Sequence, residues 1–120
     1  MTLEDFYKSI ESSYEEAKRR LMSEKLIHRF LNKFLDDPSF NELKTGIDND
    51  DFEMTYRAVH TLKGVAMNLG FEKLSKPCIE LNEYLRDHKH DIDDHACELF
   101  KDREKEYLLI IGLIKEIDKV

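Results

Sequence analysis

One segment of this chain carries three residues whose types and spacing suit the chemistry of phosphoryl groups. His60 is followed by Lys63 three residues later and by Gly64 four residues later. If the segment is helical, all three lie within one turn of each other, because residues three and four apart are neighbours on a helix surface. A neutral imidazole nitrogen is a nucleophile near pH 7, and an ammonium group beside it balances the charge of a phosphoryl group.

The apolar residues around His60 predict that its imidazole faces away from the core. They recur at spacings of 7, 3, 4 and 3, which is the seam of a helix packed in a bundle: Phe52, Val59, Leu62, Ala66 and Leu69. The seam centres near Leu62 and Ala66. At about 100° per residue, His60 points more than about 90° away from that centre.

The same geometry defines an outward face around His60. Arg57, Gly64 and Met67 share this face, and Lys63 flanks it. An interior glycine costs a helix roughly 1 kcal/mol relative to alanine, and no core packing requires one here. We therefore interpret Gly64 as a shallow notch where the backbone of another protein can approach, and Arg57 as a second source of positive field.

The elements that position this face are expected to be helices throughout. Only four glycines and two prolines interrupt 120 residues. Helices are expected at residues 3–12, 14–22, 24–36, 40–45, 52–69, 71–86 and 94–117, the last from its 4-and-3 repeat of apolar residues. Three long helices and the 24–36 helix predict an all-α, antiparallel up-down-up-down four-helix bundle with a short helical N-terminal extension, as a single domain over residues 1–120.

Several helix ends follow from local residue chemistry. Ser23 and an acid in the run 48–51 are expected N-caps, and Gly70 is expected just beyond a helix C-terminus. Ser39 is expected to cap a short helix that Gly46 closes. Pro77 is expected to kink its helix or delay its start, because proline cannot donate the helical hydrogen bond.

The bulk composition excludes several classes of function. A net charge of −7 argues against general nucleic-acid binding and against anionic membrane surfaces. The longest apolar run, residues 107–114, is too short to span a bilayer. The acidic N-terminus does not resemble a signal peptide, so we expect a soluble, cytoplasmic, freestanding monomer. Cys78 and Cys97 are expected to be buried thiols.

The remaining histidines do not predict a metal centre. The pair His88 and His90 lies in an acidic stretch, residues 87–93, expected to be a loop, and two ligands are too few for a closed zinc site. A di-iron bundle needs glutamate three residues before histidine on facing helices. Only Asp87 and His90 have a comparable spacing. We take these residues, with His28 and His95, as ordinary, and expect no metal and no cofactor.

Residues 60–70, HTLKGVAMNLG, resemble the signature of histidine-containing phosphotransfer (HPt) domains, roughly His-x-Leu-Lys-Gly followed by a Leu-Gly pair. Residues 29–40 are also similar to that family. The resemblance runs from about residue 14 to residue 88, and the last helix agrees in type only. It implies a four-helix bundle with an exposed phosphoacceptor histidine and no catalysis of its own.

Carried over by position, the resemblance assigns a role to three residues. His60 is the phosphoacceptor, at Nε2 in the family, Lys63 steadies the phosphoryl group, and Gly64 admits the partner. The implied partners are the receiver domains of response regulators, which exchange the phosphoryl group through an aspartate, and a hybrid histidine kinase. Mg²⁺ and the acceptor carboxylate are expected from the partner.

Two other functions are compatible with parts of the same pattern. A helical adaptor could dock a signalling partner through the same face without carrying phosphate. A histidine kinase dimerisation domain also uses an exposed histidine, but there an acid and soon a proline follow it. Here Thr61 follows His60, the next proline is Pro77, and no glycine-rich nucleotide segment exists.

Overall fold

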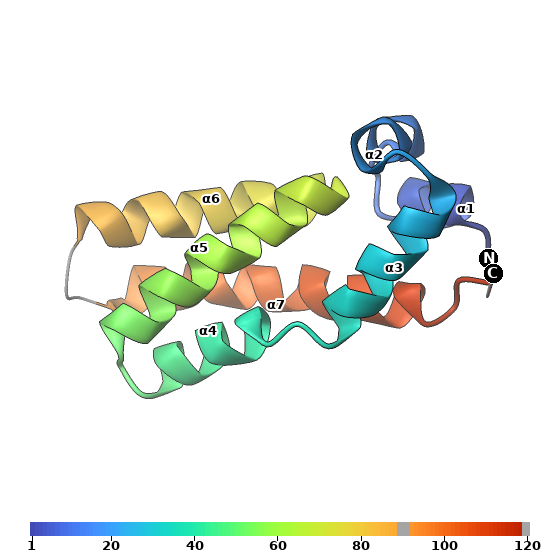
Figure 1. Ribbon diagram of the computed structural model, residues 1–120. Coiled ribbons are helices and arrows are strands. Elements are labelled where there is room, and N and C mark those ends of the chain that lie inside the picture. The colour runs from blue at the N-terminus through green and yellow to red at the C-terminus, as the bar shows by residue number, and fades with distance from the viewer. Residues whose placement is uncertain (89–91, 119–120) are drawn as a thin grey trace.

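The computed structural model describes residues 1–88 and 92–118, which form seven α-helices and no strand (Figure 1). In chain order these are α1 (Leu3–Ser9), α2 (Tyr14–Leu21), α3 (Glu24–Leu35), α4 (Ser39–Asp48), α5 (Phe52–Leu69), α6 (Glu72–Asp87) and α7 (Asp94–Ile114). The all-α class predicted from the sequence is confirmed. No helix in this described part of the chain combines the length and apolar character needed to cross a membrane.

The long helices pack as an antiparallel bundle. α5 lies between α4 and α6, and α6 packs in turn on α7. α3 and α4 follow one another along the other side of α7, where Phe40 of α4 stacks on Tyr107, so together they complete the up-down-up-down order (Figure 1). The expected first member of the bundle was the 24–36 helix alone. In the structure, α4 supplies much more of the packing against α5 than α3 does.

The N-terminal extension closes one end of the bundle. Phe6 and Tyr7 of α1 are fully buried, and their rings meet Phe71 at the start of α6. The Tyr7 hydroxyl also donates a 2.7 Å hydrogen bond to the carbonyl of Leu69, which is one of the carbonyls left unpaired at the end of α5. The extension is therefore an integral part of the core.

The two ends of the described chain meet beside α1 (Figure 1). The backbone N–H of Asp118 donates to the carbonyl of Met1 at 2.8 Å, and the Met1 ammonium lies 3.1 Å from the Asp118 carboxylate. This contact connects the segment after α7 to the segment before α1.

α7 carries one charged residue in its buried seam. Arg103 is buried, and its guanidinium lies 3.8 Å from the Glu80 carboxylate of α6.

The two cysteines differ in burial, and Cys78 lies close to Arg103. Burial raises the pKa of the Cys78 thiol to about 12, and Arg103 opposes that shift. Cys78 is therefore a protonated, apolar core residue as expected, whereas Cys97 is only half-buried, so the expectation of a buried thiol was wrong there.

Several predicted helix ends are confirmed. The Ser23 hydroxyl accepts from the N–H of Leu26, and the Asp51 carboxylate accepts from the N–H of Met54. Gly70 follows α5 with a φ of 78°, in the left-handed region that glycine adopts without strain. In each case the cap depends on chemistry within a few residues of the helix end.

The predicted end of α1 was wrong. α1 ends at Ser9 and does not reach residue 12. The N–H of Ser12 bonds to the carbonyl of Tyr7, and the N–H of Glu11 to that of Lys8. Glu11 has a φ of 54°, so this is a Schellman ending with a glutamate in the place that glycine usually takes.

Both ends predicted for α4 were also wrong. Ser39 is the first helical residue, and the Asp37 carboxylate accepts its N–H at 2.8 Å. Gly46 does not close α4, which continues to Asp48. Gly46 is buried where α4 crosses α5. A Cβ added there would lie 2.8 Å from the backbone nitrogen of Thr55 and closer still to its hydroxyl oxygen.

Pro77 lies inside α6, which starts at Glu72. The expected delay in the start of this helix therefore does not occur.

We expect Gly46→Ala to lower the free energy of unfolding by about 1–3 kcal/mol, because the added methyl group forces α4 away from α5. Urea denaturation measures this change. Gly112→Ala is the matched control, because a Cβ at that helical position meets nothing within 4 Å. It should raise stability by up to about 1 kcal/mol through helix propensity. Equal effects of the two substitutions would contradict the close crossing.

Candidate functional site

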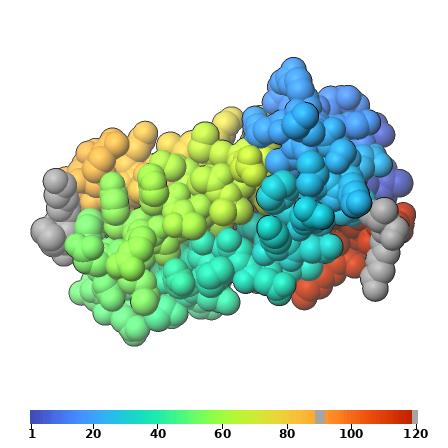
Figure 2. Space-filling model, in the orientation of Figure 1, coloured from blue at the N-terminus to red at the C-terminus, as the bar shows by residue number. Residues whose placement is uncertain are grey.

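α5 carries the predicted site on the face opposite its packing surface. Ala58, Leu62 and Ala66 are buried against the bundle, whereas His60 and Gly64 are exposed. Between α4 and α6, α5 crosses the visible face of the molecule, drawn green to yellow-green in Figure 2. The imidazole of His60 therefore faces solvent, in the direction expected from helical geometry.

Gly64 leaves the backbone of α5 open one turn beyond His60. A Cβ built on Gly64 meets no atom within 4 Å. This contrasts with Gly46, where the glycine makes room for a neighbouring helix of the same chain. Packing among the described residues therefore does not explain why position 64 is a glycine. This agrees with the interpretation of Gly64 as an open notch.

Lys63 is held towards α6. Its ammonium donates a 3.2 Å hydrogen bond to Oδ1 of Asn82 in a partly buried position. This bond fixes the long side chain beside the His60 face and reduces the rotamer freedom that a free lysine would have.

Asn82, the partner of Lys63, is not indicated as a site residue by the sequence pattern. Its side chain is buried on α6, and among the described residues its Nδ2 has no hydrogen-bond partner. An asparagine four residues after Cys78, beside the apolar seam of α6, was a signal that something polar faces it. The sequence alone does not indicate that the partner is Lys63, nineteen residues away on another helix.

The other two predicted face residues are also exposed. Arg57 lies one turn before His60, and its carbonyl accepts from the hydroxyl of Thr61 at 3.1 Å, a local bond within α5. Met67 is 48% exposed and lies towards the C-terminal end of the same face. The structure thus brings Arg57, His60, Gly64 and Met67 together on one helical surface.

A cation from another helix joins this face. Arg20 of α2 donates a hydrogen bond to the carbonyl of Met67, near the C-terminal end of α5. A cation is favourable there because the last carbonyls of a helix carry partial negative charge. The sequence pattern does not indicate this contact, because α2 and α5 are far apart along the chain.

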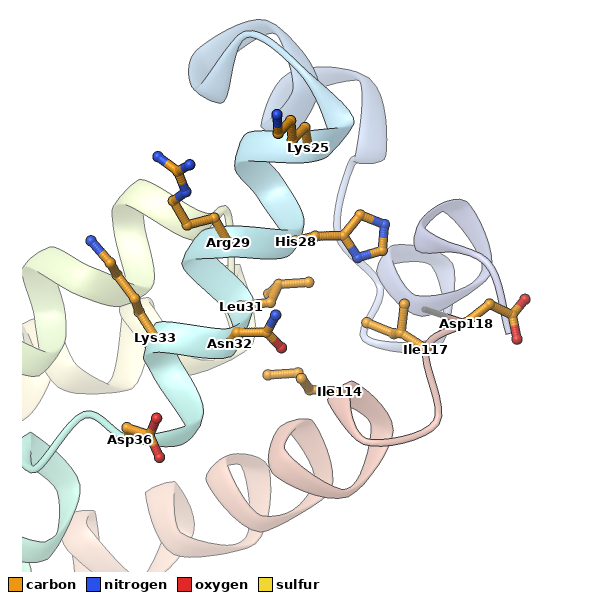
Figure 3. A pocket seen from close by; sticks show the side chains of 10 residues that line it. All are labelled: Lys25, His28, Arg29, Leu31, Asn32, Lys33, Asp36, Ile114, Ile117 and Asp118. Carbon is orange, nitrogen blue, oxygen red and sulfur yellow. The ribbon is translucent and has the colours of Figure 1, made fainter. Parts of the chain in front are cut away.

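His60 lines neither of two cavities found among the described residues. One of about 700 Å³ lies between α3 and the end of α7, with Leu31, Ile114 and Ile117 among its lining and Lys25 and Arg29 projecting from α3 (Figure 3). A smaller one of about 160 Å³ lies between α2 and the end of α5. The smaller cavity reaches Met67 at the C-terminal end of the His60 face, whereas the exposed imidazole of His60 lies on the open surface of α5.

The other described histidines make local contacts. His88 stacks on the ring of Tyr84, His95 meets that ring edge-on, and His28 lines the larger cavity. His90 and its neighbours Lys89 and Asp91 lie outside the described residues. Within residues 1–88 and 92–118, no group of three or more His, Cys, Asp or Glu side chains is arranged to hold a metal ion.

Comparison with known proteins gives one match. A family model described as the Hpt domain matches residues 2–118, nearly the whole chain. Comparisons with curated proteins and with solved structures find no match.

We expect Lys63 and Asn82 to be coupled in a double-mutant cycle. Comparing Lys63→Ala, Asn82→Ala and the double variant by urea denaturation should give a coupling of about 0.5–1.5 kcal/mol, the usual range for a partly exposed hydrogen bond. The control cycle pairs Lys63→Ala with Glu83→Ala, an exposed neighbour of Asn82. A coupling in that cycle as large as in the first would show that the lysine is not held by the amide.

Proposed function

Because this chain belongs to the Hpt domain family, we propose that it carries a phosphoryl group on His60 and exchanges it with the aspartate of response-regulator receiver domains. Membership of the family implies histidine phosphotransfer in a phosphorelay, with the domain acting as a carrier rather than as a catalyst. The observation that supports His60 most directly is its exposure on α5, one turn from an uncovered glycine backbone.

The proposed step is a displacement at phosphorus. The lone pair of a neutral His60 nitrogen attacks the phosphoryl group of a receiver aspartyl phosphate. A P–N bond forms while the P–O bond to the carboxylate breaks, and the carboxylate leaves with the bonding pair. The proton on the other ring nitrogen is then released to solvent. Transfer in the opposite direction follows the same atoms in reverse.

Lys63 is proposed to balance the charge of the phosphorylated imidazole. Its ammonium lies one turn from His60 and is restrained by Asn82, so it is already positioned when the phosphoryl group arrives. Arg57, one turn on the other side, adds a second positive charge to the same face. In a protein of net charge −7, these cations make the face locally favourable for an anion.

Gly64 and Met67 are proposed to form the docking surface around the imidazole. In-line displacement needs the two reacting groups about 3 Å apart, so the receiver backbone must come close to α5. The bare backbone at Gly64 allows that approach, and exposed Met67 offers an adaptable apolar contact. We propose that the receiver supplies Mg²⁺ and the carboxylate, and that a hybrid histidine kinase is a further partner.

We expect His60→Gln to abolish phosphorylation. Incubation of the wild-type chain with a phosphorylated receiver domain and Mg²⁺ should give acid-labile, base-stable label, which is typical of phosphohistidine. The matched control is His95→Gln, which removes another exposed histidine and should label as the wild type does.

Equal labelling of His60→Gln would refute the site assignment. If the wild-type chain binds the receiver without becoming labelled, the chain is an adaptor and not a carrier.

We expect Gly64→Ala to slow transfer without harming the fold. The new methyl group meets no atom of the chain, so stability should stay equal or rise by up to about 1 kcal/mol. The methyl group nevertheless lies where the receiver must approach, and transfer should slow by about tenfold or more, roughly 1.4 kcal/mol in the barrier. Time courses of label transfer measure this effect. Ser9→Ala, an exposed helical position on α1, should transfer at the wild-type rate.

A further inference from the structure

The outer surface of α7 carries an apolar patch that the proposed function does not use. Leu108 is 59% exposed and Leu109 is 48% exposed. Gly112, three residues after Leu109, is exposed too, and a Cβ there would meet nothing within 4 Å. At about 100° per residue, Lys105, Leu108 and Leu109 fall within about 60° of Gly112. Glu116 lies two residues beyond the end of α7, in a turn that continues the helix path, where its N–H bonds to the carbonyl of Leu113 at 3.0 Å. We call these five residues the α7 outer face.

The α7 outer face lies away from the His60 face. α7 packs on α6 and on the α3–α4 side of the bundle, whereas α5 packs on α4 and α6. α5 and α7 are therefore diagonal members of the bundle, and their exposed surfaces point in different directions. A partner on α7 would leave the imidazole accessible.

The α7 outer face is complementary to itself in one register. Residues 109 and 112 are centred on a point midway between residues 110 and 111, and residues 105 and 116 are centred on the same point. In an antiparallel pair of α7 helices related by a twofold axis through that point, each Leu109 lies opposite the partner's Gly112. Each Lys105 then lies opposite the partner's Glu116, and each contact occurs twice, as a twofold interface requires.

We infer that a second copy of this chain covers the α7 outer face, through antiparallel packing of α7 against α7. The notch at Gly112 accepts the Leu109 side chain of the other copy, which removes apolar surface from water. The Lys105 and Glu116 charges select this register over others, while exposed ion pairs of this kind add little affinity.

The proposed dimer is weak. Each copy contributes one helix, so the contact is smaller than the roughly 800 Å² per partner of a standard stable interface. We expect a dissociation constant on the order of 10⁻⁴ M. The monomer expected from the sequence thus prevails at low concentration, and the dimer forms where the chain is concentrated or tethered.

Sedimentation equilibrium from about 10 μM to 1 mM tests the inference, since this range brackets the expected constant. The wild-type chain should shift from monomer to dimer. Gly112→Leu fills the notch and should raise the dissociation constant at least about tenfold. Circular dichroism should stay unchanged, because the site is open in the monomer. Monomer at every concentration, or a dimer that survives Gly112→Leu, would overturn the inference.

A charge swap tests the register. Lys105→Glu and Glu116→Lys should each weaken dimerisation, because each places like charges opposite one another. The double variant restores both pairs, keeps the net charge of the wild type, and should dimerise as the wild type does. Lys8→Glu on α1 changes the net charge as Lys105→Glu does and should have no effect. A double variant as weak as the singles would exclude the proposed register. No step of this assay involves phosphate, so its outcome is independent of the proposed function.

Discussion

The burial of one side of α5 determines where everything else on that helix points. Leu62 and Ala66 are fully buried between the flanking helices, and a helix turns by about 100° per residue. Because those two residues face the core, His60 and Gly64 face the solvent. The bundle thus orients the imidazole through apolar packing on the opposite side of the helix.

Close approach between helices supports this arrangement. The crossing of α4 over α5 is tight enough that Gly46 has no space for a side chain beside Thr55. At the other end of α5, the Tyr7 hydroxyl and the Arg20 guanidinium each satisfy a terminal carbonyl. α5 is therefore held near both ends by other helices.

The sequence predicted those features that depend on local chemistry or on one helical period. The caps at Ser23, Asp51 and Gly70 and the exposure of His60 are of this kind. Features that depend on another helix were missed. Gly46 was taken as a helix stop because glycine usually ends helices, and its neighbour Thr55 is known only once α4 and α5 are packed. The Lys63–Asn82 bond was missed for the same reason, since it joins two helices across nineteen residues. The roles of the site residues remain predictions from the motif.

The meeting of the chain ends has a consequence for how such a unit can be built into larger proteins. Because Asp118 bonds directly to Met1, the polypeptide enters and leaves the bundle at nearly the same point. A unit of this shape can be inserted into a surface loop of a host protein without stretching the host backbone. It is equally suited to circular permutation, in which a short linker joins the old ends and new ones are opened at an exposed turn.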